Sequence, residues 1–169
     1  MRHAFIAFLV ATLLVACGSS AASQTPDADA TGKSSKSMRI GGSIHVLVVD
    51  DSKFTVRMFW PLRKEDGYVM HTAENGEMAM KFLNDTPLES RPDIIFVDDT
   101  LPDQDADQFV RTMTSDERYK DIPVVMILGE KFVYHLHYGL QNGASGFLQK
   151  PFRAEDLVSI TERRVSGQP

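Results

Sequence analysis

The stretch Asp93-Ile94-Ile95-Phe96-Val97-Asp98-Asp99-Thr100-Leu101-Pro102 decides the fold of this chain. Its apolar run, Ile94 to Val97, is bounded by polar residues and a proline, which is the pattern of a strand buried on both faces of a parallel sheet. The strand ends on two acids. Carboxylates have no structural role at the end of a strand that is fully buried. Because open α/β sheets bind ligands in the crevice outside the carboxyl ends of their strands, the stretch also predicts a ligand site.

Two further apolar runs end on charged residues. Residues 44–49 lead into Asp50 and Asp51, and residues 146–149 lead into Lys150. Carboxylates gathered at one edge raise one another's pKa values, so they stay ionised only if a cation lies among them. Hard oxygen ligands without His or Cys favour Mg²⁺. Together with a lysine, such a site suits a phosphoryl group, and an aspartate can be the nucleophile.

The order and spacing of these residues resemble the receiver domain of two-component response regulators, over residues 43–165. The resemblance implies that Asp98 is the phosphoacceptor, because Pro102, Asp105 and Ala106 follow it as the family's proline, aspartate and glycine do. It implies a phosphoacceptor signalling module in a two-component phosphorelay, served by a histidine kinase or another phosphodonor.

A Mg²⁺ site also follows from the resemblance. Its expected direct ligands are Asp98, Asp51 and the backbone carbonyl of Thr100, with Asp50 acting through water. Lys150 is implied as the cation beside the phosphoryl group, and its peptide bond to the following proline is expected to be cis.

The predicted fold class is α/β, with five strands alternating with five helices and a parallel sheet covered on both faces. The resemblance implies a flavodoxin-like, doubly wound sheet in the order 2-1-3-4-5. Pro61 is expected to kink or break the first helix at Trp60, and the Trp60 ring to pack against the bend. The helices are predicted over residues 53–66, 77–84, 105–114, 131–142 and 153–165.

The chain departs from the family at the switch positions. Counting from Pro123, Leu128 stands where the family has Thr or Ser, whose hydroxyl movement draws in an aromatic residue on the fifth strand. That aromatic position is Phe147 here, and neither side chain has a hydroxyl to donate. Two hypotheses stay open: an altered switch, in which Gly129 lets the loop offer backbone N–H groups to the phosphate, or a degenerate receiver that binds protein partners without phosphorylation.

The expected partner is a protein, docked on the helix over residues 131–142 and the strand over residues 146–149. The net charge of -5 disfavours nucleic-acid binding. No enzymatic activity is expected beyond transfer of a phosphoryl group to Asp98 and its later hydrolysis. A phosphatase of the haloacid dehalogenase type needs Asp-x-Asp at its first strand end, and neither acid pair of the chain has that spacing.

Residues 1–17 resemble a bacterial lipoprotein signal peptide. A short basic start precedes an apolar run, residues 4–16, which is too short to span a bilayer comfortably. The run ends in Leu-Val-Ala-Cys-Gly, which is similar to a lipobox, so Cys17 is the expected lipidation site and membrane anchor. Gly18 then implies the periplasmic side of the outer membrane.

Residues 18–42 lack an apolar period and are expected to form a flexible tether, while the tail, residues 166–169, is expected to fray. An exported receiver would not meet a cytoplasmic kinase. A cytoplasmic protein that starts at Met38 is therefore kept as the alternative.

Overall fold

Five parallel strands form a single sheet in the order β2-β1-β3-β4-β5 in the computed structural model, which describes residues 42–64, 67–129 and 132–167. All of these residues fall in one of two units of the chain, Ser34–Pro169. The strand order and the parallel pairing confirm the predicted fold class. The strands are β1 (Ile44–Val49), β2 (Tyr68–Ala73), β3 (Ile94–Asp98), β4 (Val124–Leu128) and β5 (Gly146–Gln149).

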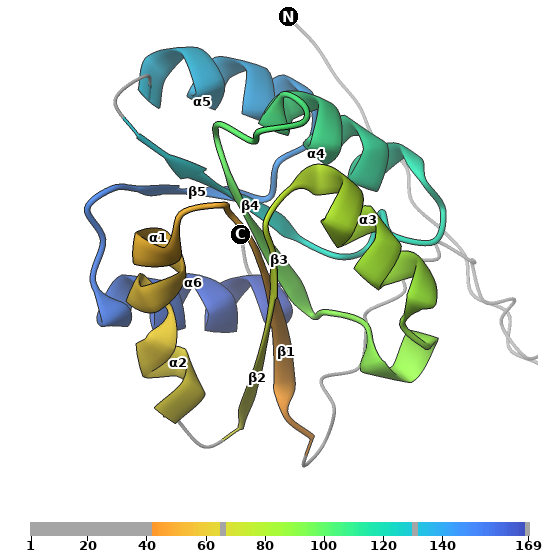
Figure 1. The fold of residues 1–169 in the computed structure, drawn as a ribbon, viewed down its shortest axis with the longest axis vertical. Helices are drawn as coiled ribbons and strands as arrows, with labels where there is room; N and C mark the ends of the chain where they lie inside the picture. The colour runs from red at the N-terminus through yellow and green to blue at the C-terminus, as the bar shows by residue number, and fades with distance from the viewer. Residues whose placement is uncertain (1–41, 65–66, 130–131, 168–169) are drawn as a thin grey trace, which may run out of the picture. The chain divides into compact units, whose positions relative to one another are not determined.

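The three central strands are buried on both faces, because helices cover each side of the sheet. One face packs against α3, α4 and α5, and the opposite face packs against α1, α2 and α6 (Figure 1). The helices are α1 (Lys53–Met58), α2 (Trp60–Lys64), α3 (Gly76–Asp85), α4 (Ala106–Ser115), α5 (Phe132–Gln141) and α6 (Ala154–Val165), with a short 3₁₀ helix at Leu88–Ser90. No helix in these ranges combines the length and the apolar character that crossing a membrane requires.

The expected number of five helices is wrong, because the first predicted helix is divided into α1 and α2. The break lies at Phe59, next to the predicted position, because Pro61 has no N–H to continue the helical ladder and is instead tolerated in the first turn of α2. Trp60 does not pack into the bend as expected. Its side chain is 48% exposed, and the guanidinium carbon of Arg57 lies 5.8 Å from the ring centroid.

The register of the sheet determines which strand ends meet. Val49 of β1 pairs with Val97 of β3, so the residues that follow, Asp50 and Asp98, lie side by side on neighbouring strands. On the other side of β3, Asp98 pairs with Ile127, one residue before the end of β4. The predicted functional residues therefore collect at the carboxyl edge of the sheet.

Candidate functional site

The centre of the site is an ammonium group held between two buried carboxylates. Nζ of Lys150 lies 2.5 Å from Oδ1 of Asp98 and 3.4 Å from Oδ2 of Asp50. Asp50 is 1% exposed and Asp98 is 7% exposed, so neither carboxylate is shielded by bulk water. The cation that the clustered acids require is thus supplied, in part, by the chain itself.

Backbone contacts hold Asp50 and Lys150 in place. Asp50 Oδ1 accepts a hydrogen bond of 2.7 Å from the Ser52 N–H. Lys150 follows β5, and its N–H donates to the Leu128 carbonyl at 2.8 Å. The peptide bond between Lys150 and Pro151 is cis, as predicted.

Burial and charge shift the pKa values of Asp98 and Lys150. Burial raises the pKa of Asp98, and the negative charges of Asp50 and Asp99 add to this, while the hydrogen bond from Lys150 only partly offsets it. For Lys150, burial alone would lower the pKa, but the hydrogen bond and charge of Asp98, followed by the charge of Asp50, outweigh it and raise the pKa. Lys150 is therefore a stable cation at neutral pH.

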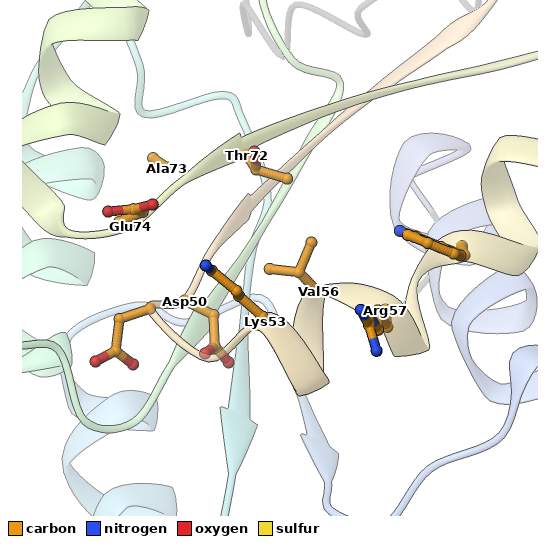
Figure 2. A pocket seen from close by; sticks show the side chains of 9 residues that line it. Asp50, Lys53, Val56, Arg57, Thr72, Ala73 and Glu74 are labelled. Atoms are coloured by element: carbon orange, nitrogen blue, oxygen red, sulfur yellow. The ribbon is translucent and has the colours of Figure 1, made fainter.

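Asp51, which follows Asp50 in the chain, is exposed and lines a pocket of about 280 Å³. The pocket lies between the start of α1 and the end of β2, as Figure 2 shows. Its lining combines acidic, basic and apolar side chains: Asp50, Asp51, Lys53, Val56, Arg57, Trp60, Thr72, Ala73 and Glu74. The pocket thus reaches the acid pair Asp50 and Asp51 at the end of β1.

The acids do not gather into a ready-made metal cage. Among the residues that the structure describes, no three His, Cys, Asp or Glu side chains are grouped closely enough to hold a metal ion. The structure joins Asp98 to Asp50 through Lys150, and leaves Asp51 and Thr100 exposed at the same edge. This donor set still fits Mg²⁺, which keeps several waters and is usually held by one or two carboxylates.

Both predicted switch positions lie in the packed interior or against it. Leu128, at the end of β4, is fully buried, and Phe147 is half-buried against the same core. A Cβ atom added to Gly139 of α5 would lie only 2.8 Å from Cε1 of Phe147 and 2.5 Å from Sδ of Met126. The missing side chain at Gly139 therefore lets α5 sit directly on the Phe147 ring.

Two acids that sequence reasoning passed over also act at this edge. Asp99 Oδ2 accepts a hydrogen bond of 2.9 Å from the Gly129 N–H. Asp103 accepts hydrogen bonds from the Gly76 N–H at 3.0 Å and the Glu77 N–H at 2.8 Å, and so caps α3 from a distant loop. The doubled acid at the end of the central strand was a visible signal for Asp99, whereas nothing in the local sequence indicates the Asp103 contact.

The predicted lipidation site, Cys17, lies outside the described residues, as do the predicted leader and most of the tether.

Comparisons with known proteins agree with this geometry. The family model of the response regulator receiver domain matches residues 46–162. The chain is 31% identical over 122 residues to protein PilG of Pseudomonas aeruginosa, covering 72% of this chain and 87% of that protein. It is 26% identical over 129 residues to the two-component response regulator ORR5 of Oryza sativa, covering 76% and 94%.

The solved structures give the same result. The chemotaxis response regulator CheY4 of Vibrio cholerae superposes with a TM-score of 0.64 and 30% sequence identity, over 72% of this chain and 98% of that one. The fold, the acidic edge with its lysine and these similarities lead to one conclusion: the chain belongs to the response regulator receiver domain family, whose members signal in two-component systems through aspartyl phosphorylation.

Proposed function

We propose that this chain is a phosphoacceptor signalling module in which Asp98 receives the phosphoryl group. The observation that carries the proposal is the contact of the Lys150 ammonium with both buried carboxylates, Asp98 and Asp50. A nucleophilic carboxylate needs a fixed positive charge nearby to balance the phosphoryl oxygens, and this geometry provides one.

In the proposed reaction, one oxygen of Asp98 attacks the phosphorus of an acyl phosphate or phosphohistidine. The new Asp98 O–P bond forms as the bond to the donor breaks, and the donor leaves with the electron pair. Lys150 keeps a positive charge beside the transferred group. Mg²⁺, when bound by Asp98, Asp51 and the Thr100 carbonyl with Asp50 in support, would neutralise the remaining phosphoryl oxygens. Later hydrolysis restores Asp98, and no other chemistry is proposed.

The test is the mass of the intact protein after incubation with acetyl phosphate and Mg²⁺. We expect a gain of one phosphoryl group, which chelation of Mg²⁺ prevents. Asp98→Asn should abolish the gain, and Lys150→Ala should reduce it. The same gain in Asp98→Asn would contradict the assignment of the acceptor.

The switch is proposed to be altered rather than intact. Leu128 offers no hydroxyl to the phosphoryl group, and Phe147 is already packed beneath α5. Phosphorylation then changes the surface of α5 and β5 less than in a receiver with Thr or Ser at the Leu128 position. This surface is the proposed docking site for a protein partner, and no nucleic-acid partner is proposed.

The same packing favours a second function, a binding module that works without phosphorylation. Its output surface would be fixed by Leu128 and Phe147 whatever the state of Asp98. Two results would favour this function. Acetyl phosphate would fail to phosphorylate the wild type, and a partner would bind Asp98→Asn as tightly as the wild type.

For localisation we propose a lipoprotein, anchored through Cys17 on the periplasmic side of the outer membrane. The proposal is supported by the leader and lipobox in the sequence. Cys17→Ser should lose label from radioactive fatty acid and leave the membrane fraction. A native protein that begins at Met38 and fractionates with the cytoplasm would contradict export, and would place the chain in the compartment where histidine kinases use ATP.

A further inference from the structure

We propose that Asp99 is an internal competitor of the phosphoryl group, because its carboxylate occupies the backbone N–H of Gly129 at the end of β4. The inference rests on the proposed role of Asp98 as the phosphoacceptor. It assigns a function to the second acid of the central strand, which the phosphoryl-transfer chemistry does not use.

The contact is fixed from two sides. Asp98 pairs with Ile127 in the β3–β4 register, and the N–H of the next residue, Asp99, donates to the Ile127 carbonyl at 3.0 Å. The chain then returns the interaction, because the Gly129 N–H donates to Asp99 Oδ2 at 2.9 Å. Backbone and side chain of Asp99 thus both hold the end of β4.

The Gly129 N–H is the donor that an anion at this edge needs. Leu128 has no side-chain donor, so the next N–H at the end of β4 is that of Gly129. In this proposal a group added to Asp98 meets the Lys150 ammonium, which already contacts Asp98, and reaches the Gly129 N–H, which lies two residues beyond Ile127, the partner of Asp98 in the sheet register. The Gly129 N–H is engaged by an ionisable carboxylate, and charge-assisted bonds of this kind are about twice as strong as neutral ones.

Two consequences follow. A phosphoryl group on Asp98 has to displace Asp99 from Gly129 and remain beside a second negative charge, so Asp99 weakens its retention. In the unphosphorylated chain, the Asp99 carboxylate also already binds the Gly129 N–H, at the start of the connection between β4 and α5. Because a ligand shifts an equilibrium only by its differential affinity for two states, phosphorylation has less left to change there.

Binding of beryllofluoride, a phosphoryl mimic, in the presence of Mg²⁺ tests the competition. Asp99→Ala should bind the mimic roughly tenfold more tightly than the wild type, a factor that corresponds to one charge-assisted hydrogen bond. Asp99→Asn, which keeps an acceptor oxygen but loses the charge, should fall between the two. The control is Glu77→Gln, which removes an exposed acid from the first turn of α3, outside the pocket, and should leave binding within about twofold.

A second measurement needs neither metal nor mimic. In the unliganded protein, Asp99→Ala should shift the Gly129 amide proton upfield and speed its exchange with solvent. An unchanged Gly129 amide would contradict the contact, and unchanged or weaker mimic binding in Asp99→Ala would contradict the competition. If neither the wild type nor Asp99→Ala binds the mimic, while the Gly129 amide moves as expected, the failure lies with the proposed function of Asp98, and the competitor role falls with it.

Discussion

At the scale of single residues, the site is a balance between buried carboxylates and one ammonium group. Asp50 and Asp98 are both withdrawn from water, and Lys150 is the cation that contacts both of them in the described structure. A buried charge that is only partly compensated costs stability, so we expect the carboxylates at this edge to lower the free energy of unfolding. The pH dependence of that cost can be predicted from Asp98.

We predict that Asp98→Asn is more stable than the wild type at neutral pH without Mg²⁺. Burial, with the charges of Asp50 and Asp99, raises the pKa of Asp98 above its ordinary 3.8 despite the bond from Lys150. A carboxyl with a raised pKa binds more protons in the folded state, so it destabilises the fold above its folded-state pKa and no longer does so below 3.8.

The stability gap between Asp98→Asn and the wild type should therefore close as the pH falls towards 4, which urea unfolding at a series of pH values measures. The control is the exposed Asp121→Asn. A wild type that is the more stable of the two at pH 7, or a gap that does not change with pH, would contradict the balance described above.

At the scale of elements, α3 is tied to the loop that follows β3. Asp103 accepts from the Gly76 and Glu77 N–H groups, and these hydrogen bonds lower the pKa of Asp103 despite the opposing effect of desolvation. A carboxylate at a helix N-terminus is favoured by the free N–H groups and by the helix dipole. The loop that follows Asp98 is thus fixed at its far end.

Asp103→Ala should lower the free energy of unfolding by about 1 kcal/mol, the usual value of one helix cap. It should also speed hydrogen exchange at the Gly76 and Glu77 amides. Asp121→Ala is the control, because Asp121 is an exposed acid in a turn outside the helices. Equal effects of the two substitutions would show that the Asp103 contacts contribute nothing specific.

A histidine pair joins β1 to β2. It gives the stability of the fold a pH dependence opposite in sign to that from Asp98. Nε2 of His71 lies 3.3 Å from Nδ1 of His45, and the rings are stacked. Burial, followed by the charge of His45, lowers the pKa of His71 below 6.5. A base with a lowered pKa binds fewer protons in the folded state, so its contribution is complete above pH 6.5 and is lost as the pH falls through the folded-state pKa.

We therefore expect the wild type to lose stability between pH 7 and 5 more steeply than His71→Gln. Thermal unfolding across this range, with the exposed His137→Gln as the control, measures the difference. Parallel pH profiles for the wild type and His71→Gln would rule the pair out as the cause.

At the scale of the whole molecule, the sequence predicts the features that depend on a fully buried strand or on a proline. A strand covered on both faces must be apolar throughout, so β3 could be bounded to within a residue. Pro61 likewise located the break between α1 and α2, although not that it would make two helices.

The exposure of individual helix residues was less predictable. Trp60 was expected to pack against the bend, yet it is 48% exposed, because the direction of a side chain depends on how its helix is rotated against the sheet. The contact of Asp99 with Gly129 could not be predicted for a related reason. The contact depends on the direction in which the Asp99 side chain points, and no periodicity in the sequence indicates that direction.

We propose that the chain keeps the phosphoacceptor edge of a receiver but not its usual switch. The most direct test is the change in backbone amide chemical shifts of α5 and β5 on adding beryllofluoride and Mg²⁺, in the wild type and in Leu128→Thr. We predict small shifts in the wild type and larger shifts in Leu128→Thr, because only the threonine hydroxyl gains a bond to the mimic. Wild-type shifts as large as those of Leu128→Thr, with the mimic bound in both, would contradict the claim.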